Sequence, residues 1–376
     1  MKPEKQYEFS DVINLSVVQQ IAQSIQQVWK PFDAVGFEEA IAPTLSTLAF
    51  KERANLIATA MYDFLPKDFG QTGQLLLDSF GSELTSLDFS GASVFMYMPH
   101  GVYVSRYGLE EAHFELAATF LYEMTKRFSA EFAIRPFLAK YPKRMLEKLV
   151  QWVRDDNQHV RRLVSEGTRP RLPWAARVTA FDADYSVIIN LLEQLKNDPE
   201  LYVRRSVANH LNDLTKDREE LVVDTLQTWN QKPTKYITWI TKHALRTLVK
   251  AGNTQALALL GFSNQPAIEV ADFKLNTKQL QLGEELHFSF DVVSKSNAVQ
   301  PLMVDYILHY KKANGKQAPK VFKLKIVDLK PQQTLSLKKK QRFQHLSTRL
   351  LYAGLHKVEL QINGQRFGEE AFELVF

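Results

Sequence analysis

The chain has 376 residues with a net charge of +5, and 45% of them are hydrophobic. This length exceeds what one hydrophobic core usually organises, so we expect a folded protein of two or more domains. The sequence has no cysteine, which excludes disulfides, thiolate nucleophiles, iron–sulfur clusters and cysteine zinc sites. Its nine histidines form no His-Glu-x-x-His pattern, and we expect neither a metal nor another cofactor.

The hydropathy pattern indicates a protein that binds no membrane. No apolar run is long enough to cross a bilayer. The first residues carry Lys2, Glu4, Lys5 and Glu8, and no apolar signal core follows them. We therefore expect a cytoplasmic protein.

Positive charge is concentrated in two zones of the chain. Residues 271–376 hold 17 Lys and Arg against 10 Asp and Glu, and residues 126–177 hold 13 against 5. The remainder of the chain is acidic. Two basic zones of this kind predict surfaces that bind a polyanion, although a single charge run is more often a solvated helix face.

Up to about residue 265 the apolar residues recur at helical spacing, and prolines separate most of the segments. Residues 94–105 are richer in aromatic and β-branched residues, and we expect a long loop there. Amphipathic helices are predicted over residues 16–29, 51–65, 109–128, 131–140, 142–154, 185–196, 219–229 and 233–250.

An internal repeat lies in this helical part. Residues 155–164 align with residues 198–207, an offset of 43 positions, and residues 240–245 form a weaker third copy. An Asp at a turn followed by Val-Arg at the start of an apolar helix resembles HEAT repeats. We expect the Asp to cap the second helix of each pair, and the Arg six residues later to tie neighbouring repeats. Such solenoids present a concave groove and commonly serve as protein scaffolds.

After about residue 267 the pattern becomes that of strands. Residues 273–275, 285–293, 303–311, 319–327, 333–338 and 357–363 alternate or are rich in β-branched and aromatic residues. Asn314-Gly315 and Asn363-Gly364 carry the hairpin signal. About seven strands in this length predict an immunoglobulin-like sandwich, here without the usual cysteine pair.

Together these patterns predict a multidomain protein. Its fold class is an all-α HEAT-like solenoid followed by an all-β immunoglobulin-like sandwich. We place the first domain at residues 1–266 and the second at residues 267–376.

The most distinctive stretch combines arginines, an acid and a tryptophan. Residues 160–174 read VRRLVSEGTRPRLPW, and common nucleotide-binding and hydrolase motifs are absent from the chain. Arg162 and Glu166 are four positions apart and therefore share a helix face. An isolated pair of this kind would be an ordinary ion pair followed by a loop whose Trp packs on the solenoid. Its place in the basic zone beside Trp174 favours a functional cluster.

This stretch resembles the AlkC branch of the AlkC/AlkD alkylbase DNA glycosylases. The resemblance covers nearly the whole chain, because some members of that branch join a HEAT-like solenoid to an Ig-like domain. It implies excision of 3-methyladenine and 3-methylcytosine from duplex DNA without full base flipping. It further implies catalytic roles for Glu166, Arg162 and Trp174, for Glu131 in SAEFAIRP, and for Asp213 in NHLND.

These residue types suit that chemistry. A base alkylated at N3 is already cationic and leaves as a neutral molecule, so no general acid is needed. Positive charge develops instead on the deoxyribose, where carboxylates stabilise it and can orient water. The expected partner is double-stranded DNA carrying alkylated bases, bound by a monomer with no protein partner. Candidate DNA-binding residues are Arg161, Arg169, Arg171, Arg204, Arg205, Lys242, Lys338, Lys339 and Lys340.

Two other classes of function compete with this interpretation. A non-catalytic HEAT-repeat scaffold that binds nucleic acid or protein would explain the basic groove, but it gives no reason for Glu131 and Glu166 within it. A carbohydrate-binding or adhesion protein would explain the Ig-like domain, but the missing signal sequence argues against that class. The Ig-like domain itself either grips DNA or caps the end of the solenoid.

Overall fold

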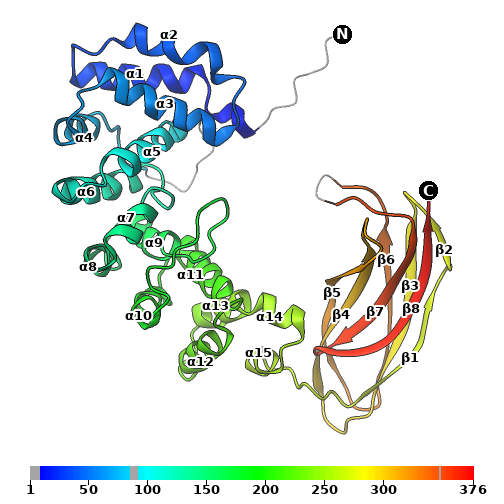
Figure 1. Cartoon of the computed structure of the whole chain (residues 1–376). Helices are drawn as coiled ribbons and strands as arrows, with labels where there is room; N and C mark the ends of the chain where they lie inside the picture. Colours follow the sequence, from blue (N-terminus) through cyan, green and yellow to red (C-terminus); the bar gives the residue numbers. More distant parts are fainter. Residues whose placement is uncertain (1–8, 85–91, 347–348) are drawn as a thin grey trace. The chain divides into compact units, whose positions relative to one another are not determined.

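The computed structural model describes residues 9–84, 92–346 and 349–376 (Figure 1). The charged residues 2–8 considered above lie outside this part. The chain forms two compact units, one made of residues 1–214 and 233–240, the other of residues 215–232 and 241–376. Helices precede strands, as the sequence predicts for the fold class. Across the described ranges, every helix is too short or too polar to traverse a membrane.

The first unit is a helical solenoid (Figure 1). Its helices bury apolar stripes against their neighbours. In α1, for example, Val17, Ile21 and Ile25 are fully buried at helical spacing. Its elements are η1 (Phe9–Val12), α1 (Leu15–Val28), α2 (Ala34–Leu45), α3 (Phe50–Phe64), α4 (Phe69–Asp78), η2 (Ala92–Met96), α5 (Tyr97–Tyr107), η3 (Glu111–His113), α6 (Phe114–Thr125), α7 (Arg135–Lys140), α8 (Pro142–Trp152), α9 (Gln158–Gly167), α10 (Ser186–Leu195), α11 (Leu201–Leu214) and the start of α13 (Lys235–Ala244).

The loop predicted for residues 94–105 is wrong, because η2 and α5 occupy this segment. Tyr97, Gly101 and Val104 are buried at helical spacing, so packing on neighbouring helices outweighs the preference of aromatic and β-branched residues for strands. Helices α2, α4 and α15 (Thr254–Leu259) were not predicted at all. The predicted helix over residues 233–250 is interrupted at Leu245 and forms α13 and α14 (Arg246–Ala251).

The repeated arginines tie neighbouring helix pairs together, as their spacing predicts. Arg161 on α9 binds both carboxylate oxygens of Asp198, at 2.7 and 3.1 Å. Arg204, its counterpart on α11, donates to the main-chain carbonyls of Asp198 and Pro199, and its guanidinium lies 3.9 Å from the centre of the Tyr236 ring. Both guanidinium groups therefore serve the solenoid itself.

The predicted helix cap is wrong in detail. Asn157 caps α9, since its side chain accepts a hydrogen bond of 2.8 Å from the His159 amide. Asp155 lies two residues earlier and accepts a 2.8 Å hydrogen bond from the Asn157 amide. The aspartate thus shapes the turn, and the asparagine satisfies the helix end.

The second unit combines three helices with a β-sandwich. The helices are α12 (Glu219–Asn230), α14 and α15 (Thr254–Leu259), together with the end of α13. One sheet has the order β1-β3-β6 and the other β2-β8-β7-β4-β5. Large side chains such as Phe288, Phe290, Tyr306 and Phe372 fill the core between the sheets. The strands are β1 (Ile268–Leu275), β2 (Gln279–Gln281), β3 (Glu285–Ser294), β4 (Gln300–Lys311), β5 (Gln317–Leu329), β6 (Thr334–Arg342), β7 (Gly354–Ile362) and β8 (Gln365–Val375).

Both predicted Asn-Gly hairpins are present, joining β4 to β5 and β7 to β8. The second one also contacts the helices of its own unit. Asn363 donates to the carbonyl of Ser263 at 2.9 Å, and a Cβ at Gly364 would lie 2.9 Å from the Cα of Gly252. This close approach of two backbones packs the β7–β8 turn against the helical end of the unit.

We expect Gly364→Ala to destabilise the second unit more than Gly315→Ala. Both glycines have positive φ, +81° and +77°, so each substitution incurs the backbone cost of roughly 1 kcal/mol. A Cβ at Gly364 additionally meets the Gly252 backbone, whereas nothing lies within 4 Å of the same atom at Gly315. Urea unfolding should show an extra loss of about 1–3 kcal/mol for Gly364→Ala. Equal losses for the two variants would contradict the packing.

Candidate active site

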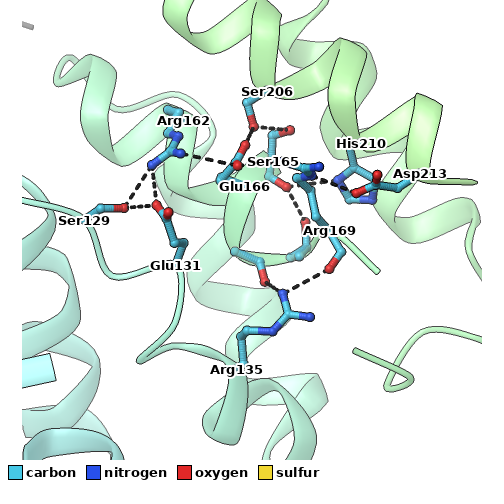
Figure 2. A network of polar contacts seen from close by, with 12 residues as sticks. Ser129, Glu131, Arg135, Arg162, Ser165, Glu166, Arg169, Ser206, His210 and Asp213 are labelled. Carbon is cyan, nitrogen blue, oxygen red and sulfur yellow. Dashed lines mark hydrogen bonds and ion pairs between the residues drawn. The ribbon is translucent and has the colours of Figure 1, made fainter. Parts of the chain in front are cut away.

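A cluster of charged side chains joins three parts of the first unit: residues 129–135, helix α9 with the loop after it, and helix α11 (Figure 2). Helices α9 and α11 pack directly on each other. They are the equivalent second helices of the two repeat copies. The repeat therefore stacks these two helices so that polar side chains from each can meet.

Arg162 lies between two glutamates of the cluster (Figure 2). Its Nη1 donates to Ser129 Oγ at 2.9 Å and to Glu131 Oε2, and its Nη2 lies 3.3 Å from Glu166 Oε1. The prediction that Arg162 and Glu166 share one helix face is confirmed. Glu131 lies in a turn, whereas the sequence predicts it at the start of a helix over residues 131–140; α7 begins only at Arg135.

The Glu166 carboxylate is fully engaged by its neighbours. Oε1 accepts from Arg169 Nη1 at 2.7 Å in addition to Arg162, and Oε2 accepts from Ser206 Oγ at 2.6 Å. Glu166 is buried. Burial alone would raise the pKa of Glu166, but Arg162, Arg169 and the Ser206 hydroxyl outweigh it and hold the pKa below its usual value. Glu166 is therefore ionised at neutral pH.

Glu131 differs from Glu166 in that one of its oxygens is available. Oε2 accepts from Ser129 and Arg162. Within the described residues, Oε1 has no hydrogen-bond donor, and the side chain is 16% exposed. Glu131 therefore combines a fixed orientation with an oxygen that can face a ligand or a water molecule.

Asp213 extends the cluster along α11. Its Oδ2 accepts from Arg169 Nε at 2.8 Å, so Arg169 bridges Glu166 and Asp213. The three acids that the resemblance names thus lie in one connected network with Arg162. Burying so many charges requires such mutual pairing.

Several members of the network escaped the sequence analysis. Ser129 and Ser206 bind the two glutamates, and buried His210 contacts the Ser165 carbonyl and the Tyr185 hydroxyl, each at 2.9 Å. Burial lowers the pKa of His210 to about 3, so this ring is neutral. A signal for Ser206 did exist, because the repeat alignment puts it opposite the apolar Leu163.

Trp174 lies in the loop between α9 and α10 in an unusual conformation. Its φ is +64°, and the residue is 67% exposed. The indole ring lies 6.1 Å from the Phe9 ring, and Lys51 donates to the Trp174 carbonyl. The alternative interpretation, in which an ordinary loop packs this Trp on the solenoid, is not supported, because the residue is largely exposed.

Comparison with known proteins identifies the family. Residues 269–376 match the model of the C-terminal Ig-like domain of the uncharacterised protein YhaZ. The protein YhaZ of Bacillus subtilis is 34% identical over 360 residues, covering 95% of this chain and 97% of that protein. The alkylpurine DNA glycosylase AlkC of Pseudomonas fluorescens, solved with DNA containing an abasic site analog, is 36% identical with a TM-score of 0.88, covering 98% of this chain and 99% of its own. The chain belongs to the AlkC family.

The match to AlkC extends over the helices and the sandwich alike, since it covers 98% of this chain. The family resemblance inferred from residues 160–174 is thereby confirmed. The charged cluster is built largely around those residues. It lies in the helical unit of an AlkC-like solenoid fold.

The basic residues expected to contact DNA in this AlkC-family chain fall into three groups, two of them on the helical part. Arg161, Arg169 and Arg204 use their guanidinium groups within the solenoid, as described above. These contacts favour structural roles for all three, because a guanidinium held by an acid or by carbonyls is not free for phosphate. Arg171, Arg205 and Lys242 are exposed.

The remaining candidates lie on the sandwich. On β6, Lys338 and Lys340 are exposed, and Lys339 is half-buried. Together with Lys274 and His287, these lysines line a hollow of about 470 Å³ on the β1-β3-β6 sheet. Lys340 also lies 3.3 Å from Glu285. This face of the sandwich is therefore predominantly basic.

Among the described residues, one group has the ligand types and spacing for a metal ion. Ligand atoms of His309, Glu359 and Glu369 lie within 4.8 Å of one another on the sandwich. Arg366 binds Glu359 at 2.8 Å and Lys357 binds Glu369 at 2.7 Å. Both carboxylates already have a cationic partner, which disfavours a further cation.

Proposed function

We propose that this AlkC-family protein is a DNA glycosylase. Its substrates would be cationic N3-alkylated bases in duplex DNA, 3-methyladenine and 3-methylcytosine, and its reaction hydrolysis of the N-glycosidic bond. The observation that carries this proposal is the pair of glutamates on Arg162, of which Glu131 keeps an unengaged oxygen. Support comes from the near full-length similarity to an alkylpurine DNA glycosylase.

In the proposed reaction, the bond between C1′ and the base nitrogen breaks, and its electron pair neutralises the cationic base. No general acid is needed for this departure. The deoxyribose then carries oxocarbenium-like positive charge, which an ionised carboxylate stabilises. A water oxygen bonds to C1′, and its proton passes to Glu131, the acid with an available oxygen.

The other cluster residues would hold this acid in place and contact the nucleotide. Arg162 fixes Glu131, and Glu166 in turn fixes Arg162 and balances its charge. The exposed indole of Trp174 offers a face for the sugar or for the cationic base. An exposed aromatic and an open acid suit recognition without full base flipping, since no deep enclosed pocket is required.

The direct test is incubation with freshly methylated duplex DNA, followed by chromatography of the released bases. We expect 3-methyladenine and 3-methylcytosine, and no release from unmodified DNA. Addition of EDTA should not inhibit. Strong inhibition by EDTA would contradict the mechanism. DNA binding without any release would indicate the non-catalytic scaffold.

We further propose that the basic face of the sandwich contacts the DNA backbone. Changing Lys338, Lys339 and Lys340 to Glu should weaken binding and flatten its dependence on salt, because each lost phosphate contact reduces the slope by about 0.9. Titration of labelled duplex DNA at several salt concentrations measures both. The matched control changes Lys320, Lys325 and Lys330, which are exposed at the other sheet. If both triple variants weaken DNA binding equally, the loss reflects the change in net charge and not a contact made by the basic face.

A further inference from the structure

The conformation of Trp174 is not explained by packing of its own side chain. A positive φ is unfavourable for a bulky L-residue such as Trp174. Because the residue is 67% exposed, Trp174 gains little from burial. Other residues must therefore hold this segment, and two cations from distant parts of the chain bind its carbonyls.

Arg135 binds the loop on both sides of Trp174. Its Nη1 donates to the carbonyls of Gly167 and Arg169 at 3.1 and 3.0 Å (Figure 2). Its Nε donates to the carbonyl of Ala176 at 2.9 Å. One planar guanidinium thus joins the start of the loop to a point beyond Trp174. An ammonium group could not span these acceptors in the same way.

Arg135 is buried, although its hydrogen bonds go to neutral carbonyls rather than directly to an acid. Burial lowers its pKa to about 10, which leaves the group charged at neutral pH. Gly167 is the last residue of α9, and the carbonyl end of a helix attracts a cation. The main effect of this buried charge is to fix the geometry of the loop whose carbonyls the guanidinium binds.

Lys51 holds the tryptophan itself. Lys51 is an exposed residue in the first turn of α3, and its Nζ donates to the main-chain carbonyl of Trp174. The same ammonium lies 5.7 Å from the centre of the Phe132 ring. Phe132 directly follows Glu131, and Arg135 lies four residues after Glu131. Both cations therefore link Trp174 to the segment that carries the open acid.

We propose that Lys51 and Arg135 are positioning residues that hold the Trp174 indole in register with Glu131. The inference rests on the proposed function in that Trp174 would contact the damaged nucleotide. Neither cation needs to touch substrate. Each acts by restricting the loop, so its loss lets the indole sample orientations that are unproductive for excision.

The first test does not depend on enzyme activity. Fluorescence anisotropy decay is recorded for the full chain and for Lys51→Met, each with and without Trp174→Phe, so that the difference isolates Trp174 from the other tryptophans. We expect a larger amplitude of fast local motion for Trp174 in Lys51→Met. Lys140→Met is the matched control, because Lys140 also donates to one carbonyl, that of Leu109, at 2.8 Å. An unchanged Trp174 signal would overturn the proposal.

The second test uses single-turnover excision of 3-methyladenine by saturating enzyme. Lys51→Met should lower the rate roughly tenfold, and it should cause no further loss when Trp174 is already Ala, since residues that act through one another are non-additive. Additive losses would show that Lys51 acts independently of Trp174 and would overturn the proposal.

If Arg135→Lys folds, it should show the same increased motion of Trp174 and the same lower excision rate as Lys51→Met. If Arg135→Lys does not fold, Lys51→Met alone tests the proposal. An inactive parent protein would refute the proposed function. The anisotropy experiment would still decide whether the two cations hold the loop.

Discussion

Replacing Glu131 by glutamine should lower the rate of base excision by about a hundredfold or more, with little change in affinity for undamaged duplex DNA. Glutamine retains the size of the side chain and can still accept from Arg162 and Ser129, but it cannot stabilise positive charge or take a proton from water. The loss therefore falls on the transition state, where the deoxyribose becomes cationic. Single-turnover rates and equilibrium binding, measured side by side, separate these effects.

The matched control for this experiment is Glu147→Gln. Glu147 is an exposed acid on α8 within the same basic stretch of sequence, outside the charged cluster. Its substitution changes the net charge by the same amount and should leave the rate unchanged. A Glu131→Gln protein that excises at the parent rate would rule out the mechanism, even if the protein proved to be a glycosylase.

Replacing Glu166 by glutamine should reduce stability as well as excision. Glu166 is buried, and its carboxylate binds the side chains of Arg162, Arg169 and Ser206. Without its charge, two guanidinium groups lose a shared counter-ion in a region poor in water. Removing one partner of such a buried network costs about 3 kcal/mol or more. Excision should fall as well, because Arg162 also orients Glu131.

The stability loss has a definite pH dependence. The pKa of Glu166 in the folded protein lies below its ordinary value of 4.5, so the ionised carboxylate stabilises the fold fully above that value. As the pH falls through the lowered pKa, the parent protein loses this contribution and the glutamine variant does not. The difference between the two in urea unfolding should therefore be large at pH 7 and shrink in acid.

Ser206→Ala serves as the comparison for Glu166→Gln. It removes the hydrogen bonds from the Ser206 hydroxyl to Glu166 and Ser165 and leaves both ion pairs, and it should cost about 1–2 kcal/mol. A Glu166→Gln protein no less stable than Ser206→Ala at pH 7 would show that the ion pairs contribute little. Effects of Glu131 and Glu166 substitutions on the rate should not add, because both acids act on Arg162.

Local rules of chain geometry account for what could be predicted. Residues four apart on a helix share a face, which placed Arg162 beside Glu166. A repeat of fixed period brings equivalent positions of successive helix pairs together, which anticipated the link from Arg161 to Asp198. Asn-Gly supports the tight turn of a hairpin, which located the β4–β5 and β7–β8 connections.

The tertiary structure alone decided how these parts combine into a candidate site. Ser206 reaches Glu166 because α11 stacks on α9, and Arg135 reaches the Trp174 loop because the turn before α7 folds against the end of α9. The predicted loop over residues 94–105 became a helix for the same kind of reason, since burial of one face depends on neighbours distant in sequence. The residues next to a side chain in the sequence limit which contacts it can make. Packing between elements selects the contact that forms, because packing removes water from that contact.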